Sequence, residues 1–551
     1  MALEGFVPYS REAASLYMKR RWWLGITLGD LFDKACDLYP NKEALVGASK
    51  RYTFAALRRE VDKLAGALLA HGLKPGDRVL LQLPNWPEFV ISYFALQKAG
   101  LVVVLLTVDH TAREIAHLAR LTSPRGWILP RRYRKTDCVP LIGQVRAENP
   151  ALETVILAGE GLDDCLDLDA LIEEGGRLED LGLMLEEVRP DPGDVCQILP
   201  SGGTTGLPKG APRTHNDYIC NVEYKSKAWD MNVTDVCLVA TTVGHNLALL
   251  VCVTAAVFHG AKIVMLDSTY PEDFCRTVQE EEVTCTGLVP TLASRIANFE
   301  KLGDFDLESL QKVYVGAAKS FPELVQKVES NLGGLYFHAF GMVEGPCCQT
   351  RPLDPFEVRA QTIGRPICPY DEFRTLDLQG RPTPRGTEGE LAAKGPGVFT
   401  GYFRNPQANL SAFTPDGWFR TGDLAVIDED GNIRITGRIK DIIIRGGENI
   451  AAEEVEELIS SHPGVEYVAV VGMPDPDFGE AICAFIKPVS GARLCEADII
   501  EHLRQTGASK IFQPKRFEFI NEIPLTAAGK ADKKVLRQAV MERTRDAEQK
   551  Q

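Results

Sequence analysis

The sequence lacks any excess of positive charge. It has 61 lysines and arginines against 76 aspartates and glutamates, so its formal net charge is −15. Nucleic acids and anionic membrane surfaces are bound through a basic footprint, and this balance disfavours both as the main partner. A small polyanion could still bind, but local groups would have to hold it.

The sequence also lacks the cysteine spacing of a metal site and the apolar segments of a membrane protein. Its fourteen cysteines are scattered without a CxxC pair, which favours free thiols in a reducing cytosol over disulfides or a zinc site. The longest largely apolar run, Leu247 to Phe258, is too short to span a bilayer and predicts a buried helix. No apolar stretch follows the charges near the N-terminus, so no signal peptide is expected. We expect a cytoplasmic protein without membrane insertion.

Helical and strand-like periods alternate along much of the chain. Residues 53–72 have the spacing of an amphipathic helix, and apolar strand-like stretches at 77–84 and 101–107 flank a further helical segment. Strands joined by helices at this spacing predict crossover units and a mostly parallel sheet. The predicted fold class is α/β, and 551 residues are too many for one hydrophobic core.

The sequence pattern changes at Gly364. Short strands with frequent glycine and proline turns continue to Thr436 and predict a β-rich closing section of the large domain. A smaller unit follows, in which helices and strands predict an α+β domain with a basic tail. We therefore expect an N-terminal domain at residues 1–438 and a C-terminal domain at residues 439–551.

A segment rich in glycine and hydroxyl side chains, SGGTTGLPKG, begins at Ser201. Glycines let backbone N–H groups approach an anion, hydroxyls supply short donors and Lys209 adds charge, which together suit a phosphate cradle. It is not a Walker A loop, because Pro208 stands where that motif has its second glycine and Lys209 is followed by glycine. A flexible surface turn is the alternative interpretation.

Five motifs, in this order, resemble those of the adenylate-forming superfamily. That superfamily contains acyl- and aryl-CoA ligases, nonribosomal adenylation domains and luciferases, and the resemblance covers nearly the whole chain. The motifs are SGGTTGLPKG at 201–210, FGMVE at 340–344, WFRTGDL at 418–424, GRIKD at 437–441 with GGENI at 446–450, and PLTAAGK at 524–530.

The resemblance implies that ATP is a substrate, that Mg²⁺ is the metal, and that a carboxylate attacks the α-phosphorus of ATP. Lys530 would neutralise the negative charge that builds around the α-phosphorus and grip the incoming carboxylate. Lys209 would add positive charge at the phosphate loop, and Glu344 would hold Mg²⁺. Asp423 would accept hydrogen bonds from both ribose hydroxyls, and Arg438 would fix the ribose edge. A surface lysine, a solvated glutamate and a turn cap are the structural alternatives for Lys530, Glu344 and Asp423.

The resemblance further implies a phosphate loop and an adenine pocket. Phe340 replaces the usual tyrosine and Val343 the usual threonine, so two hydroxyls of the family pattern are missing. The residues implied to bind ATP here are Ser201, Gly202, Gly203, Thr204, Thr205, Gly206, Gly316, Ala317, Ala318, Ala339, Phe340 and Gly341.

The C-terminal domain of such enzymes rotates between two half-reactions, and the resemblance puts the hinge at Lys440. In the first state Lys530 points at ATP. In the second state Gly446 and Gly447 would line a tunnel for the incoming thiol, where a side chain would block a narrow pantetheine path. A plain β-turn is the alternative for the two glycines. The thiol would be coenzyme A or the phosphopantetheine of a carrier protein.

The stretches at 212–218, 244–246 and 447–454 resemble stand-alone aryl-acid AMP ligases of the 2,3-dihydroxybenzoate type. In that branch a His-Asn pair lies beside the aryl ring, and its asparagine meets the 2-hydroxyl of the acid. His245 and Asn246 are the corresponding pair here, although Asn246 could instead cap the following helix.

Leu250 and Val251 stand where that branch has small hydroxyl residues. Burying a 3-hydroxyl unpaired against an aliphatic wall costs about 1–3 kcal/mol, or roughly 5–150-fold in affinity. We therefore expect benzoate, a monohydroxybenzoate or a cyclic aliphatic acid, with medium-chain fatty acids as an alternative. The residues predicted to contact the acid are His245, Asn246, Val251 and Val343.

The sequence thus predicts an ATP-dependent acid:thiol ligase that forms an acyl-AMP and releases pyrophosphate. The loss of catechol-specific polarity favours coenzyme A as the acceptor. A 2,3-dihydroxybenzoate- or salicylate-AMP ligase that loads a separate aryl carrier protein is the alternative. A non-catalytic acid-binding protein on the same fold is a more distant one.

Overall fold

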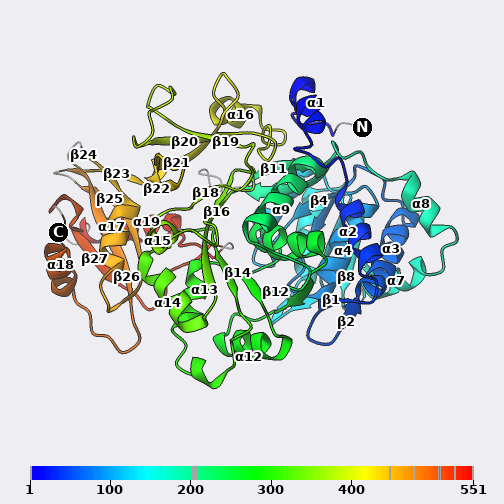
Figure 1. Cartoon of the computed structure of the whole chain (residues 1–551), viewed down its shortest axis with the longest axis horizontal. Helices are drawn as coiled ribbons and strands as arrows, with labels where there is room; N and C mark the ends of the chain where they lie inside the picture. Colours follow the sequence, from blue (N-terminus) through cyan, green and yellow to red (C-terminus); the bar gives the residue numbers. More distant parts are fainter. Residues whose placement is uncertain are drawn as a thin grey trace.

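The computed structural model describes residues 3–159, 161–162, 164–201, 208–318, 320–445, 448–475, 478–506, 508, 510–526 and 529–548. Figure 1 shows the N-terminal segments at one end of the long axis and the C-terminal segments, labelled α17, α18 and β25–β27, at the other end. The green middle of the chain lies between these two ends.

The first large sheet has nine strands in the order β18-β17-β16-β15-β14-β12-β13-β1-β2. Its central strands, from β16 to β1, pair in parallel, and its antiparallel pairs lie at the two edges. The bounds are β1 Glu43–Val46, β2 Arg51–Thr53, β12 Val236–Val239, β13 Lys262–Met265, β14 Cys285–Leu288, β15 Lys312–Val315, β16 Leu335–Gly341, β17 Cys347–Gln349 and β18 Arg365–Pro366.

The second large sheet has seven strands in the order β11-β10-β4-β3-β5-β8-β9. All four residues of β4 are buried, as expected of a parallel strand covered on both faces. Only the β10–β11 pair among these strands is antiparallel. The bounds are β3 Arg78–Leu81, β4 Val102–Leu105, β5 Gly126–Pro130, β8 Thr154–Ala158, β9 Leu166–Asp167, β10 Val195–Ser201 and β11 Lys209–Thr214, and a separate hairpin joins β6 Arg132–Tyr133 to β7 Thr136–Asp137.

Helices connect these strands, and the sequence periods account for them. The segment predicted at 53–72 forms α3, which Thr53 caps by accepting from the backbone N–H of Ala56; its apolar face is buried. The other helices of the large part are α1 Arg11–Lys19, α2 Leu28–Leu38, α4 Pro87–Lys98, α5 Ala112–Thr122, α6 Val139–Glu148, α7 Leu168–Gly175, α8 Leu181–Glu187, α9 His215–Ala228, α12 Pro271–Glu281, α13 Pro290–Ala297, α14 Pro322–Leu332, α15 Phe356–Gln361 and α16 Pro406–Ala412.

The apolar run that predicted one buried helix from Leu247 to Phe258 is divided into three parts. A short helix α10 (Asn246–Ala248) leads into a π-helical turn, η1 (Leu249–Thr254), and then into α11 (Ala255–His259). The Thr254 hydroxyl donates to the carbonyls of Leu249 and Leu250, each at 3.0 Å. A π turn carries an extra residue and is common at functional sites, and hydrophobic periodicity cannot reveal it.

The β-rich section forms a four-stranded antiparallel sheet in the order β19-β20-β21-β22. Its strands are β19 Glu372–Leu376, β20 Gly389–Lys394, β21 Phe419–Ile427 and β22 Ile433–Arg438. After β22 the chain makes a single 3₁₀ turn, η3 (Ile439–Asp441), and enters a different sheet at Ile442. The predicted boundary after Arg438 falls in this short connection.

The C-terminal unit is built on a five-stranded sheet in which β24, β23, β26 and β25 are neighbours and β27 also pairs with β26. It has a hydrophobic core of its own, which includes Ile443, Val455 and Ile482. The fold class is therefore as predicted: α/β, with a large N-terminal part of mostly parallel sheets and a smaller C-terminal α+β unit. Its elements are β23 Ile442–Arg445, β24 Glu448–Ala451, α17 Ala452–Ser460, β25 Val465–Asp475, β26 Gly479–Pro488, α18 Glu496–Gln505, β27 Arg516–Phe519 and α19 Lys533–Glu548.

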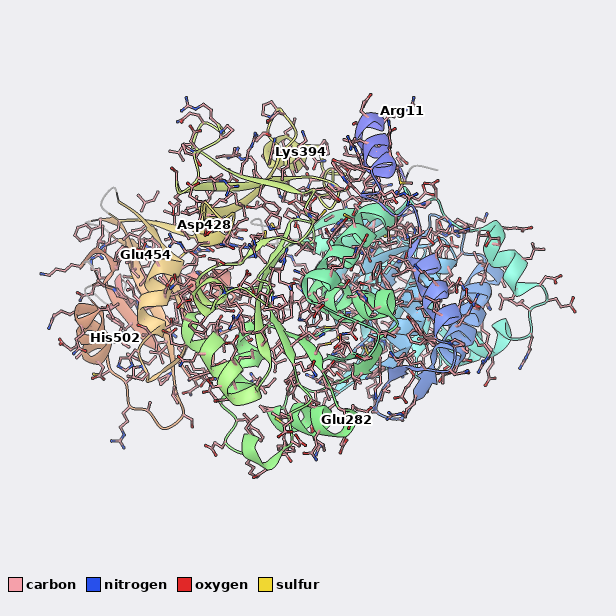
Figure 2. The ribbon with its side chains drawn as sticks, in the orientation of Figure 1. Arg11, Glu282, Lys394, Asp428, Glu454 and His502 are labelled. Carbon is pink, nitrogen blue, oxygen red and sulfur yellow. The ribbon has the colours of Figure 1, made fainter. Side chains whose placement is uncertain are left out.

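Charged side chains such as Arg11, Glu282 and Lys394 lie at the outer surface of the molecule (Figure 2). All fourteen cysteines are described and free, and Cys495 alone among them is exposed. No helix in the described ranges combines the length and apolarity that crossing a bilayer requires.

Candidate active site

A cavity of about 2490 Å³ is lined by residues of the nine-stranded sheet, the closing four-stranded sheet and the C-terminal unit. It gathers most of the residues that the sequence predicts for the site, although they are distant along the chain. The predicted residues that line it are Ser201, His245, Asn246, Val251, Ala317, Ala318, Ala339, Phe340, Gly341, Val343, Glu344, Asp423, Arg438, Lys440 and Lys530.

Two other predicted residues, Gly316 and Lys209, are not among the residues that line the cavity. A Cβ on Gly316 would come within 3.1 Å of the Ala339 carbonyl oxygen, so this position supports the wall from behind. Lys209 places its Nζ 4.6 Å from the centroid of the Tyr402 ring. The loop glycines and threonines at 202–206 and the glycine pair at 446–447 lie outside the described residues.

One end of the cavity holds Glu344, whose side chain is buried. Its Oε1 accepts a hydrogen bond of 2.8 Å from the Tyr402 hydroxyl. Burial and then the Glu344 charge raise the pKa of Tyr402, so this tyrosine stays a neutral donor. Ser201 and Lys209 face each other as the paired last and first residues of β10 and β11. This end therefore combines a fixed carboxylate with a lysine and the strands that frame the predicted phosphate loop.

Glu344 suits a Mg²⁺ ion that is also held by the phosphates of a bound nucleotide. In the part of the chain that the structure describes, no three His, Cys, Asp or Glu side chains are arranged to hold a metal ion by themselves. Mg²⁺ is commonly held by one or two carboxylates plus substrate phosphates. A single buried carboxylate beside a predicted phosphate loop matches that arrangement.

The middle of the cavity holds an ion pair between Asp423 on β21 and Arg438 on β22. The two residues face each other across the strands, and Arg438 Nε lies 2.7 Å from Asp423 Oδ1. The second oxygen, Oδ2, is buried and has no hydrogen-bond partner among the described residues. Burial raises the pKa of Asp423, while Arg438 acts in the opposite direction. A carboxylate oxygen left unsatisfied at a cavity wall suits a ligand hydroxyl.

Lys530 reaches the same space from the C-terminal unit. Its loop is anchored locally, because Gly529 N–H donates to the Thr526 carbonyl at 2.8 Å. It also contacts the large part, where the Thr291 hydroxyl at the start of α13 donates to the Gly529 carbonyl at 3.4 Å. Burial and the neighbouring Arg438 lower the pKa of Lys530 to about 8, and Asp423 partly opposes them.

The other end of the cavity is built around Asn246. The Tyr218 hydroxyl on α9 donates to Asn246 Oδ1 at 3.0 Å. His245, rather than Asn246, occupies the N-cap of α10 and accepts from the Leu247 N–H through Nδ1 at 3.3 Å. The alternative that Asn246 caps this helix is therefore wrong. A Cβ on Gly244 would come within 2.1 Å of the Leu106 carbonyl oxygen, so only glycine fits before the pair.

The two ends of the cavity are close enough to interact. Burial first, and then the charge of Lys530, lower the pKa of His245 to about 4. His245 is thus neutral at pH 7, and Lys530 is close enough to act on it electrostatically. Leu250 and Val251, both on the π turn η1, form part of that pocket's wall.

Several residues that line the cavity, or that hold its lining residues in place, are absent from the sequence prediction. Tyr402 holds Glu344, Tyr218 holds Asn246, and the pocket wall also includes Lys225, Tyr314 and Cys347. None of them belongs to the five motifs. The spacing of Tyr218 and Lys225 does predict that both lie on one face of a helix, because residues seven apart share a face.

A two-part α/β fold with such a cavity at the junction is that of the adenylate-forming enzymes, and known proteins match it. Residues 32–403 match the AMP-binding enzyme family, and residues 454–530 match the AMP-binding enzyme C-terminal domain. The chain therefore belongs to the AMP-binding enzyme family. The superfamily that the five motifs indicate is thereby confirmed, and the chain is an enzyme.

Individual relatives are similar over their full length. The chain is 37% identical over 544 residues to a Streptomyces protein named salicylyl-CoA synthase / salicylate adenylyltransferase, covering 98% of each. It is 36% identical over 541 residues to salicyl-AMP ligase / salicyl-S-ArCP synthetase of Mycobacterium tuberculosis, covering 97% of this chain and 94% of the relative. The apo structure of MbtA from Mycobacterium smegmatis is 34% identical, with a TM-score of 0.75 and coverage of 97% and 99%. The predicted resemblance to stand-alone aryl-acid AMP ligases is thus confirmed.

Proposed function

We propose that this enzyme is an ATP-dependent acid:thiol ligase that activates an aromatic or cyclic carboxylic acid. The observation that carries the proposal is the single cavity in which Lys530, Asp423 and Glu344 meet the pocket around Asn246. In the first step a carboxylate oxygen bonds to the α-phosphorus of ATP, the α–β bridging bond breaks, and pyrophosphate leaves. In the second step a thiol sulfur bonds to the acyl carbon, AMP leaves, and the thiol proton passes to solvent.

Each charged group has a distinct part in the first step. Lys530 stabilises the negative charge that develops between the carboxylate and the α-phosphorus. Asp423 accepts from the ribose hydroxyls through Oδ2, the oxygen that Arg438 leaves unpaired. Glu344 would hold Mg²⁺ on the phosphates, where the ion neutralises charge, and Lys209 adds a cation at the same end.

The second step requires Lys530 to leave the cavity so that the thiol can reach the acyl-AMP. The link between the two parts of the chain is the short turn η3, which contains Lys440. We propose this turn as the hinge, with the division into residues 1–438 and 439–551. The thiol tunnel at Gly446 and Gly447 remains a prediction.

The pocket wall favours an acid without a 3-hydroxyl, because the side chains of Leu250 and Val251 offer such a hydroxyl no hydrogen-bond partner. For the thiol we propose coenzyme A. One relative is named for coenzyme A and another for an aryl carrier protein, so carrier loading of salicylate or 2,3-dihydroxybenzoate is the second candidate.

Acid-dependent ATP–pyrophosphate exchange tests the proposal. The acids are benzoate, salicylate, 2,3-dihydroxybenzoate, cyclohexanecarboxylate and octanoate, and coenzyme A is then added with the best acid. We expect a ring without a 3-hydroxyl to be preferred and a thioester to form on free coenzyme A. Exchange with 2,3-dihydroxybenzoate alone, without a coenzyme A product, would establish the carrier-loading alternative instead.

The adenylation rate should fall as the pH rises through about 8. The pKa of Lys530 is lowered to about 8, so the free enzyme loses this cation above that pH while the acid stays ionised. We expect kcat/KM for exchange with benzoate to fall about tenfold per pH unit on the alkaline side. In Lys530→Arg the fall should move to higher pH, because a guanidinium stays charged. A wild-type profile that remains flat to pH 9.5 would contradict the role of Lys530.

A hydroxyl placed on η1 should shift the preference of the enzyme toward catechol acids. In Val251→Ser the new hydroxyl can pair with a 3-hydroxyl, which should raise the ratio of kcat/KM for 2,3-dihydroxybenzoate to that for benzoate about tenfold. Val251→Ala is the matched control, since it removes the same bulk without adding a hydroxyl. If both variants shift the ratio equally, pocket volume rather than hydrogen bonding sets the preference.

A further inference from the structure

Lys225 is a buried lysine that forms no ion pair with any residue the structure describes. It lies on α9, and its side chain is 1% exposed. Its Nζ has no hydrogen-bond partner in the described part of the chain. Its ammonium group lies over the ring of Tyr314, whose centroid is 4.7 Å from Nζ. A cation–π contact of this kind is worth far less than the cost of taking an ammonium group out of water.

Lys225 also belongs to the wall of the active-site cavity, together with Tyr314, Cys347 and Asn246. On α9 it lies seven residues after Tyr218, whose hydroxyl holds Asn246. These two residues therefore share one helix face, and that face is directed toward the pocket around Asn246.

The surroundings of Lys225 leave its charge uncompensated. The groups that act on it electrostatically are the thiols of Cys347 and Cys348 and the guanidinium of Arg351, and no carboxylate is among them. Burial is the main cause that lowers the pKa of Lys225 to about 8, so the ammonium form predominates at pH 7. A structural lysine at such a depth is usually paired with a carboxylate.

We propose that Lys225 binds a second acidic oxygen of the substrate acid, at the end of the molecule away from the carboxyl group that is activated. The substrate is then an aromatic or cyclic acid whose ring also carries a second carboxylate or a phenolic oxygen. The apolar wall of Leu250 and Val251 contacts the ring, and the ammonium group of Lys225 binds the oxygen of the substituent at its far end. This inference rests on the proposed ligase function and names its substrate class.

The test is acid-dependent ATP–pyrophosphate exchange with the full-length enzyme. The acids are benzoate, 4-hydroxybenzoate, benzene-1,3-dicarboxylate and benzene-1,4-dicarboxylate. We expect at least one substituted acid to exceed benzoate in kcat/KM by about 10–100-fold. In Lys225→Met this ratio should fall to about one or below. The acid with the highest kcat/KM shows whether Lys225 binds a second carboxylate or a phenolic oxygen.

Lys227→Met is the matched control, because Lys227 lies on the same helix but is exposed and pairs with Glu223. It should keep the wild-type ratio. Removing an unpaired buried charge should leave the melting temperature of Lys225→Met equal or higher. Should that variant fail to fold, Lys225→Gln, which keeps a donor without the charge, must show the same direction of change.

Two results would overturn the role of Lys225: benzoate equal to or better than every substituted acid, or an advantage of the substituted acid that survives in Lys225→Met. Both results leave the ligase function intact. Failure of the proposed function looks different, because no acid of either panel would then support exchange in the wild-type enzyme.

Discussion

Lys530→Ala is expected to lower acid-dependent ATP–pyrophosphate exchange by about a thousandfold. The ammonium group is directed into the cavity beside Asp423 and Arg438, where it would meet the charge that develops in the transition state. Loss of one preorganised donor at such a site costs about 10²–10³-fold in rate. Thioester formation from supplied acyl-AMP should be largely spared, because the role proposed for Lys530 belongs to the first half-reaction. The measurement is both half-reactions on the same preparation.

Lys510→Ala is the control for this experiment, since Lys510 is an exposed lysine of the same C-terminal unit that does not line the cavity. Both half-reactions should be unchanged in that variant. If Lys530→Ala lowered the two half-reactions equally, the role proposed for Lys530 would be wrong, and the lysine would serve the C-terminal unit as a whole.

Asp423→Asn is expected to lower kcat/KM for ATP by about a hundredfold. The asparagine keeps the size of the side chain but cannot accept from both ribose hydroxyls and pair with Arg438 at the same time. The measurement is exchange kinetics with ATP as the varied substrate. The loss should appear mainly in KM, since ribose contacts hold ATP equally before and during the chemical step.

Asp430→Asn provides the matched control, because this exposed aspartate lies in the turn between β21 and β22, the two strands that carry the Asp423–Arg438 pair. Its ATP kinetics should be those of the wild type. An unchanged KM in Asp423→Asn, with a melting temperature near that of the wild type, would show that Asp423 supports the closing sheet rather than the ribose.

The sequence alone could indicate much of the ATP side of the site because those residues lie in short, contiguous motifs. Asp423 lies in one such motif and Lys530 in another, and each needs only its own turn or strand to be positioned. The mostly parallel sheets were equally predictable, since helical and strand periods alternate over many residues. Local signals of this kind are readable without knowledge of the tertiary fold.

The acid end of the cavity was less predictable because it is assembled from separate elements. Tyr218 and Lys225 come from α9, Tyr314 from β15 and Cys347 from β17. They become neighbours only once the nine-stranded sheet and α9 pack together. The π turn is unpredictable for a different reason: it lies within an apolar run, whose periodicity does not separate a π turn from an α-helix.

The exposure of one cysteine, Cys495, has a practical consequence. Cys495, at the N-cap of α18, is the exposed cysteine among fourteen free ones, and it lies in the C-terminal unit. A maleimide dye at limiting concentration should therefore label the wild-type chain there first, without any engineered cysteine. Energy transfer from that dye to an acceptor placed on the large part would then test whether the C-terminal unit moves during turnover, in real time and in solution.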